Sequence, residues 1–238
     1  MNEQLIRVRH PEMAQNRYVY KYVYVNKRHG FLYNRIKKNA NSVVMMYFHS
    51  QHGRGVVPND HDAINLAKER LPHLNNTLLL TDPATLRRMV VLRNPYDRLL
   101  SAFLDKFRDG SDFHERYRPF EISNDGFSSF ISWLEDGGIN KNGHWNLQSS
   151  LLAFPIDFYT DFIDCKRLKT ELPAFLNSVG MDGNQFGHHE NASSGKMNAT
   201  KSQSVADRYW SDDLRDRVFK LYESDFAMYR RHCGNQSA

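Results

Sequence analysis

Short apolar runs of strand length alternate with amphipathic stretches of helical period along the chain. Two of these runs, residues 17–25 (RYVYKYVYV) and 31–36 (FLYNRI), are rich in β-branched and aromatic residues. The turn-prone residues between them end in Gly30, which predicts a hairpin or two neighbouring strands. Further buried strands are predicted at residues 77–81 (TLLLT) and 88–92 (RMVVL), with a strand or two within 151–163.

Other segments carry the spacing or the end signals of helices. Asn41 and Ser42 can each cap a helix that runs into the apolar residues after them. Asn94 can cap another, with Pro95 at its first position and Asp97 in its first turn, where negative charge is favoured. Helices are also predicted at residues 63–71, 127–136, 167–180 and 212–232, and a polar loop at 187–204.

Strands that alternate with helices favour an α/β fold with a mainly parallel sheet. No repeat, low-complexity tract or break in composition divides the chain, so residues 1–238 are expected to form a single domain. With 238 residues, of which 40% are hydrophobic, the chain can bury a core, which argues against a disordered protein.

Charge and cysteine content narrow the chemistry only slightly. A formal net charge of +5 suits an anionic ligand such as a phosphate-bearing cofactor, an acidic glycan or a nucleic acid. The two cysteines, Cys165 and Cys233, have no metal-ligand spacing, so neither zinc nor a disulfide framework is expected. The sequence shows no run typical of a signal peptide or a membrane span. We therefore expect a cytoplasmic protein.

The first candidate site is the segment KKNANS, residues 37–42, between the first predicted strands and the helix that follows. In an open parallel sheet, ligands bind where strand ends lead into helices, and the free N–H groups of a helix N-terminus suit a phosphate. Lys37 and Lys38 offer positive charge and Ser42 offers a hydroxyl. The segment has no GxxxxGK[ST] pattern, which disfavours an ordinary P-loop kinase. Taken alone, it also fits a solvated turn.

The second candidate site follows the predicted strand at 88–92. Arg93 stands at the end of this strand, where a guanidinium can bind phosphate bidentately. Ser101 lies nearly two turns after Pro95, so its hydroxyl can reach an anion that lies along the helix. Taken singly, Arg93 also fits a surface ion pair and Ser101 a serine on a helix face.

Together, these segments resemble the two cofactor motifs of sulfotransferases that use 3′-phosphoadenosine 5′-phosphosulfate (PAPS). They are most similar to the carbohydrate sulfotransferases that include chondroitin and heparan enzymes and bacterial relatives. YNRIKKNANSV (33–43) is similar to the first motif, and VLRNPYDRLLSAFLDKF (91–107) matches the second nearly position by position. Later segments that resemble the family are GHWNLQ (143–148), YTDFID (159–164) and LYESDFAMY (221–229).

The resemblance implies a P-loop-like parallel sheet flanked by helices in one sulfotransferase domain. Its expected parts are cofactor motifs at about 31–48 and 88–107, acceptor-side elements at about 110–160, and a late loop and C-terminal helix at 187–232. It also implies in-line transfer of a sulfuryl group from PAPS to a hydroxyl of a carbohydrate, with 3′,5′-ADP as product and no metal required. A hydroxyl of a small molecule is the alternative acceptor.

The resemblance also assigns roles to residues. Lys38 would stabilise the negative charge that develops on the oxygen bridging sulfate to the 5′-phosphate. Lys37 stands where the family has a proline, so either lysine is a candidate for contact with the sulfuryl group. The residues implied to bind the cofactor are Lys37, Lys38, Asn39, Ala40, Asn41 and Ser42 at the 5′-phosphosulfate, Arg93 and Ser101 at the 3′-phosphate, and Lys196, with Ser193 or Ser194, in a loop over it or in a plain solvated loop.

An acceptor hydroxyl also needs a general base, and a histidine is suited to this role near neutral pH. His144 is the first choice because it lies in the GHW segment, with Trp145 as a stacking wall for a sugar. Alternatively, both side chains pack beneath the acceptor cleft. In the heparan branch the base lies between the cofactor motifs, so His73, and after it His49 or His52, are also candidates.

Two other classes of protein fit the sequence less well. A non-catalytic protein that binds polyanions or nucleic acid would use the same basic residues, but no interleaved aromatic and basic repeat or DNA-reading motif is present. A kinase-like phosphotransferase would need the Walker glycines and lysine and a magnesium carboxylate. The expected partner is therefore a carbohydrate or another hydroxyl-bearing acceptor, and not a nucleic acid.

Overall fold

The computed structural model describes residues 21–51, 65, 68, 69, 71, 72, 82–185 and 202–234, with side chains in the last range from residue 206 onward. The chain divides into two compact units, each formed from two separate stretches. The sheet unit contains the residues up to Leu92 together with Ser150–Met197. The helical unit contains Arg93–Ser149 together with the residues from Asn198 onward.

The described part of the sheet unit is built on β1 (Val23–Asn26), β2 (Phe31–Asn34), β3 (Arg87–Leu92) and β4 (Asp161–Asp164), in the order β1-β2-β3-β4. β1 and β2 pair antiparallel, and Gly30 in the turn between them has a φ of 64°, which glycine adopts readily. β2 pairs parallel with β3, and β3 pairs parallel with β4. The predicted hairpin, the strand at 88–92 and the α/β fold are therefore confirmed, whereas the strand predicted at 77–81 lies outside the described residues.

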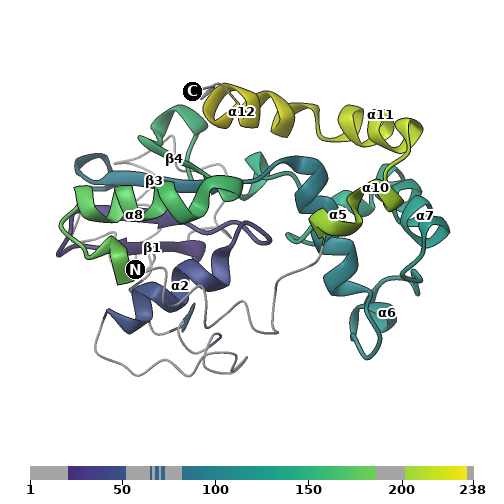
Figure 1. Ribbon diagram of the computed structural model, residues 1–238, viewed down its shortest axis with the longest axis horizontal. Helices are drawn as coiled ribbons and strands as arrows, with labels where there is room; N and C mark the ends of the chain where they lie inside the picture. The colour runs from purple at the N-terminus through teal and green to yellow at the C-terminus, as the bar shows by residue number, and fades with distance from the viewer. Residues whose placement is uncertain are drawn as a thin grey trace, which may run out of the picture. The chain divides into compact units, whose positions relative to one another are not determined.

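A hydrophobic core covers one face of this sheet, to which α2 (Asn41–Ser50) and α8 (Leu168–Ser178) contribute their apolar sides (Figure 1). Successive strand residues point to opposite faces, so Tyr33, Met89 and Val91 share this face. The helices add Val44, Met45, Tyr47, Phe48, Leu168, Leu172, Phe175 and Leu176. Both helices were predicted, and α8 continues through Pro173.

Of the strand or two expected within 151–163 the structure shows one, β4, which begins at Asp161, and the segment before it is not a strand. It forms the short 3-10 turns η5 (Ser149–Leu151) and η6 (Ile156–Phe158), and only its last residues enter β4. Its polar groups bond to the end of β2 instead. The Asn34 amide donates to the Leu151 carbonyl at 3.1 Å and accepts from the Ala153 N–H at 2.8 Å and the Tyr159 hydroxyl at 2.7 Å. Pro155, which has no N–H, also weakens a strand here.

The helical unit contains α5 (Pro95–Lys106), α6 (Phe113–Arg116), α7 (Asn124–Glu135), α10 (Ser202–Tyr209), α11 (Asp212–Leu221) and α12 (Glu223–Cys233), with the 3-10 turn η4 (Gly138–Lys141) after α7. Its core is strongly aromatic, and Trp145 is 0% exposed within it. Rings around Trp145 include Phe107, Tyr117, Phe130 and Trp133, whose centroids lie 5.0 to 6.0 Å away. Such contacts bury large apolar areas and stabilise the unit.

The predicted helix ends agree with the structure in most places. Asn94 accepts from the Tyr96 N–H at 2.9 Å and Pro95 begins α5, as the sequence predicts. α7 begins earlier than predicted because Ser123 caps it, accepting from the Gly126 N–H at 3.0 Å. Gly137, with a φ of 93°, follows its end.

Three other predictions change in the C-terminal part and the middle of the chain. The single helix predicted at 212–232 is two helices, α11 and α12, which meet at Tyr222 in a non-helical conformation. The loop predicted at 187–204 gives way to α10 at Ser202, and its earlier residues lie outside the described part. Of the helix predicted at 63–71, residues 65, 68 and 69 are described and are helical, whereas Leu71 lies in a bend after it.

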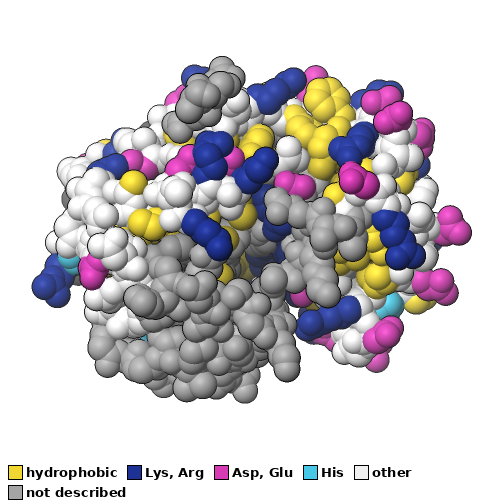
Figure 2. Space-filling model, in the orientation of Figure 1, with side chains coloured by type: hydrophobic (Ala, Val, Ile, Leu, Met, Phe, Trp, Pro, Cys, Tyr) yellow, Lys and Arg dark blue, Asp and Glu magenta, His cyan; other side chains and the backbone are white. Residues whose placement is uncertain are grey.

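The described surface carries both signs of charge. Figure 2 shows Lys and Arg side chains interspersed with Asp and Glu over the helical unit on the face that it presents. One such pair joins two helices, since Arg217 of α11 lies 2.6 Å from the Glu135 carboxylate of α7. Within the ranges that the structure describes, no helix has both the length and the apolar character needed to cross a membrane.

Candidate functional site

The first candidate site is the loop between β2 and α2, in the sheet unit. Its backbone is unusual, because Lys38 has a φ of 71° and Ala40 a φ of 54°. Left-handed backbone costs a residue with a Cβ about 1–2 kcal/mol, and neither position is a glycine. Strained residues of this kind persist where surrounding contacts hold them, and they occur preferentially at functional sites.

α2 begins at Asn41, one of the two predicted starts, but neither Asn41 nor Ser42 is its cap. Ala40 occupies the N-cap position, and its methyl side chain makes no cap hydrogen bond to the first turn. The first turn contains no acidic residue either. A left-handed residue directly before a helix turns successive N–H groups toward one point, and a helix N-terminus adds a positive partial charge. This backbone therefore suits an anion with several oxygens, such as a phosphate or a phosphosulfate.

Buried side chains fix the loop to the sheet. Asn39 is 0% exposed, and its amide donates to the Val91 carbonyl near the end of β3 at 2.8 Å. The Asn39 N–H also bonds to the Ile36 carbonyl at 3.3 Å. Before the loop, Arg35 donates to the Lys21 carbonyl at 2.9 Å. These bonds leave Lys37 and Lys38, both partly buried, on the turn between the two anchors.

The second candidate site begins in the helical unit where the chain leaves β3. Arg93 is partly buried and directly precedes the N-cap of α5. Its backbone is held by one side chain: the Arg93 N–H donates to Gln148 Oε1 at 3.1 Å, and Gln148 Nε2 donates to the Arg93 carbonyl at 2.9 Å. Ser101 lies on α5 as predicted but is 1% exposed, so it presents little surface to a ligand.

Arg98, in the same motif, has a structural role. It is 1% exposed, and it donates to the Asn146 carbonyl at 2.7 Å and to the Gly143 carbonyl at 3.0 Å. Burial lowers the pKa of Arg98 from its ordinary value, and the nearby Asp225 carboxylate opposes this effect. The Arg98 guanidinium therefore holds the GHWNLQ segment in place through two of its backbone carbonyls.

His144 lies in this segment and is partly buried. Asn142 Oδ1 accepts from the His144 N–H at 3.0 Å and lies 2.6 Å from His144 Nδ1. A backbone N–H can only donate, so the Asn142 atom that receives it must be the oxygen, and Nδ1 must then carry a proton. In the neutral imidazole, this tautomer leaves the lone pair on Nε2, which is the nitrogen able to act as a base.

Trp145 is not a wall for a sugar. It is 0% exposed, and its indole N–H donates to the Gly138 carbonyl at 2.9 Å inside the aromatic core. The prediction of an exposed stacking surface at this residue was wrong. The alternative, that the side chain packs beneath the surface, is the arrangement observed for Trp145.

Several predicted site residues are far from the candidate site or lie outside the described residues. His49 is 7% exposed and lies in the last turn of α2. The rise of a helix places it about 12 Å along the axis from Asn41, which disfavours it as the base. His73, His52, Ser193, Ser194 and Lys196 lie outside the described residues.

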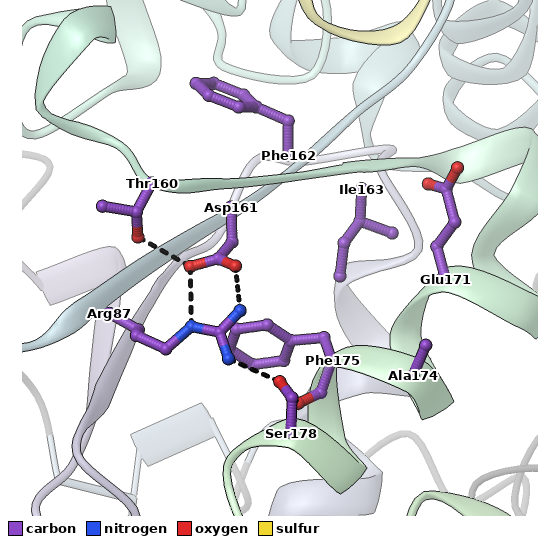
Figure 3. Close-up of a pocket in the computed structure, with 9 residues that line it drawn as sticks. All are labelled: Arg87, Thr160, Asp161, Phe162, Ile163, Glu171, Ala174, Phe175 and Ser178. Atoms are coloured by element: carbon purple, nitrogen blue, oxygen red, sulfur yellow. Dashed lines mark hydrogen bonds and ion pairs between the residues drawn. The ribbon is translucent and has the colours of Figure 1, made fainter. Parts of the chain in front are cut away.

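The sheet unit also contains a pocket lined by residues of β3, β4 and α8 (Figure 3). Its volume is about 370 Å³, and it includes Arg87 and Asp161, the first residues of β3 and β4. Arg87 forms two bonds with the Asp161 carboxylate, donates to Ser178, and lies 4.8 Å from the ring centroid of Phe175. The guanidinium thus joins β3, β4 and α8. The pocket lies at the amino ends of the parallel strands, opposite to the carboxyl ends where the candidate site is formed.

The sequence alone did not indicate Gln148, Asp225 or Asn142 as residues of interest. Asp225 is 0% exposed, and both of its oxygens accept backbone N–H bonds, from Gln148 at 2.6 Å and from Ser149 at 3.0 Å. One signal was present, since Asp225 lies beside Phe226 in the LYESDFAMY segment that resembles the family. Among the described residues, no group of three or more His, Cys, Asp and Glu side chains is placed to hold a metal ion.

The strand-to-helix loops and the mainly parallel sheet define an α/β protein whose motifs follow the order seen in sulfotransferases. The chain belongs to the sulfotransferase family, whose model matches residues 21–230. This match runs through both compact units and includes both segments that resemble the cofactor motifs. Searches of the curated proteins and of the solved structures found no match.

Proposed function

We propose that this protein is a sulfotransferase that uses PAPS as donor and a hydroxyl of a carbohydrate as acceptor. The family match supports sulfuryl transfer. The observation that carries the assignment of the donor is the start of α2, where left-handed Ala40 precedes a first turn without a side-chain cap or an acidic residue. The carbohydrate acceptor rests on the resemblance of the second motif, VLRNPYDRLLSAFLDKF, to carbohydrate sulfotransferases.

PAPS supplies an activated sulfuryl group, and 3′,5′-ADP is its leaving group. We assign the N–H groups from Ala40 to Ser42, with the Ser42 hydroxyl, to binding of the 5′-phosphosulfate. Lys38 is assigned to the bridging oxygen, where negative charge develops during transfer. Preorganised donors at such a position are worth about 3–4 kcal/mol of transition-state stabilisation. The left-handed backbone of Lys38 supports this choice over Lys37, because strained residues gather at functional positions.

Arg93 is assigned to the 3′-phosphate, which distinguishes PAPS from ordinary adenine nucleotides. It is partly buried and its backbone is fixed, so its planar guanidinium can offer two parallel donors to one phosphate. Ser101 has a smaller role in this proposal because it is 1% exposed. Lys196 is assigned to the same phosphate on the family resemblance alone.

His144 is proposed as the base that accepts the proton of the acceptor hydroxyl. Asn142 holds its Nδ1 in the protonated form, which leaves Nε2 as the basic nitrogen. His73 is the alternative base, on the resemblance to the heparan branch. A carbohydrate hydroxyl and a small-molecule hydroxyl present the same proton to this base, so the acceptor class is decided by transfer assays.

Thermal unfolding with 3′,5′-ADP and with 5′-AMP tests the choice of donor. A ligand at about 100 times its dissociation constant stabilises the native state by about 2.7 kcal/mol, which raises Tm by about 5–10 °C for a chain of this size. We expect this rise with 3′,5′-ADP and a much smaller one with 5′-AMP. Equal shifts, or none, would contradict the proposal.

The matched pair Lys38→Ala and Lys37→Ala tests the catalytic cation. With PAPS and a panel of polysaccharide and small hydroxyl acceptors, we expect Lys38→Ala to lower turnover about 10²- to 10³-fold and Lys37→Ala to retain most of it. The reverse result would exchange the roles of the two lysines. If only the small hydroxyl compounds were sulfated, the assignment of a carbohydrate acceptor would be refuted, whereas the assignment of PAPS as donor would stand.

A further inference from the structure

One side chain, Gln148, holds Arg93 by both of its backbone polar groups. Its amide accepts from the Arg93 N–H at 3.1 Å and donates to the Arg93 carbonyl at 2.9 Å. Gln148 is 0% exposed, so these bonds form away from water. Two bonds to the backbone of Arg93 fix the position of its Cα and the direction in which its side chain leaves the backbone.

Gln148 is itself held by Asp225 from α12. The Gln148 N–H donates to one carboxylate oxygen of Asp225 at 2.6 Å, and the Ser149 N–H donates to the other at 3.0 Å. Asp225 is 0% exposed. Hydrogen bonds to a buried carboxylate are charge-assisted and stronger than neutral ones, so this turn of the chain is tightly defined.

Arg98 supplies the opposite charge in this buried cluster. The guanidinium and the Asp225 carboxylate interact electrostatically, and each is almost fully buried. Arg98 also bonds to the carbonyl of Gly143, at the start of the segment that contains Gln148, and to that of Asn146 in its middle. The segment from 143 to 149 is therefore fixed at both ends, and what it presents to Arg93 is the amide of Gln148.

We infer that Gln148 and Asp225 are positioning residues for Arg93, so that the C-terminal LYESDFAMY segment serves recognition of the 3′-phosphate without touching it. The inference rests on the proposed function, in which Arg93 binds that phosphate. Neither residue contacts the donor in this arrangement. Their effect passes through the backbone of Arg93 and is confined to ligands that carry a 3′-phosphate.

The test compares binding of 3′,5′-ADP and 5′-AMP by calorimetry in four proteins: the wild type, Gln148→Met, Arg93→Ala and the double variant. Gln148→Met keeps the length of the side chain and removes both hydrogen bonds. We expect it to weaken 3′,5′-ADP about tenfold, the scale of a lost buried hydrogen bond, and to change 5′-AMP less than twofold. In the Arg93→Ala background, the same change should have no further effect.

Two further variants separate positioning from folding. Asp225→Asn acts from the other end of the network and is expected to lower 3′,5′-ADP affinity selectively, as Gln148→Met does. Ser123→Ala removes the cap of α7 in the same unit and should lower Tm without changing the ratio of the two affinities. Far-UV circular dichroism and Tm identify the variants that fold.

The outcomes are distinct. A wild type without preference for 3′,5′-ADP contradicts the proposed function and this inference together. A wild type with that preference, combined with unchanged selectivity in Gln148→Met, overturns the inference alone. Equal losses for both nucleotides, or an additive loss in the double variant, would show that Gln148 acts on folding and not through Arg93, and would also overturn it.

Discussion

The left-handed backbone of Lys38 predicts that two substitutions which remove the same side chain will differ in stability. Lys38→Ala keeps a Cβ at a φ of 71°, whereas Lys38→Gly removes it. Left-handed backbone costs a residue with a Cβ about 1–2 kcal/mol, and glycine loses about 0.5–1 kcal/mol more chain entropy on folding than alanine. The glycine variant should therefore be more stable than the alanine variant by about 0.5–1 kcal/mol.

For a chain of this size, that difference corresponds to a rise in Tm of about 1–4 °C, measured by scanning calorimetry. Urea titrations with equal m values would give the same difference in free energy of unfolding. Because both variants lack the lysine, any contact of its side chain cancels in the comparison. Both variants are expected to show the same loss of turnover, about 10²- to 10³-fold.

Lys37 provides the matched control, because it precedes Lys38 in the same loop and does not have a positive φ. There, Lys37→Gly should be less stable than Lys37→Ala by about 0.5–1 kcal/mol, so the sign of the difference reverses between neighbouring positions. The same sign at both positions would refute the reasoning. In that case the backbone of Lys38 would not be under strain, and its conformation would give no support to a functional assignment.

Three further predictions concern the helical unit. Trp145→Ala should lower the free energy of unfolding by about 3–5 kcal/mol in urea titrations because it empties the centre of the aromatic core, and a cost below 1 kcal/mol would contradict the packing. Asn142→Ala should lower kcat about tenfold with little change in KM, because the oxygen that keeps the proton on His144 Nδ1 is lost. Asn142→Asp should restore kcat, because the aspartate also places an oxygen there, and a loss in both variants would contradict this role. The Arg217 hydrogen bond lowers the pKa of Glu135, so this pair adds stability above about pH 4.3 that is lost as pH falls through the lowered pKa. Arg217→Ala should therefore cost about 0.2–1 kcal/mol at pH 7 and less once the pH has fallen well below about 4.3, where its bond to Ser132 remains, and a cost that does not fall with pH would contradict it.

The parts of the site that sequence reasoning predicted correctly depend on local signals. Asn94 caps α5 and Pro95 begins it because both residues act on the backbone beside them, whatever the rest of the chain does. The same reasoning failed at α2, where Asn41 and Ser42 were the expected caps. There the backbone conformation is set by Asn39, whose side-chain amide donates to the Val91 carbonyl of β3. Helix-capping propensities describe only neighbouring residues and take no account of such a long-range contact.

Trp145 and Asp225 show the second limit of sequence reasoning. An aromatic residue beside a histidine in a polar segment fits an exposed sugar wall as well as a buried core. Its fate depends on the rings that α5 and α7 bring around it. An aspartate in a helix with many charged residues, such as α12, fits a surface position as well as a buried one, and its burial becomes favourable only because two N–H groups and Arg98 meet it.

Arg93 and Arg98 belong to the same motif but have different surroundings. Both arginines lie within five residues of each other, yet one is partly buried beside a helix start and the other is 1% exposed. A buried guanidinium needs hydrogen-bond acceptors and an opposite charge, and these come from GHWNLQ and from Asp225 of α12. The three segments must therefore fit one another, since removing any partner would leave a buried charge or carbonyl unsatisfied. In the helical unit the three motifs therefore form one network of contacts. Their contacts, more than their residue type, distinguish Arg93, which is assigned to the ligand, from Arg98, which supports the fold.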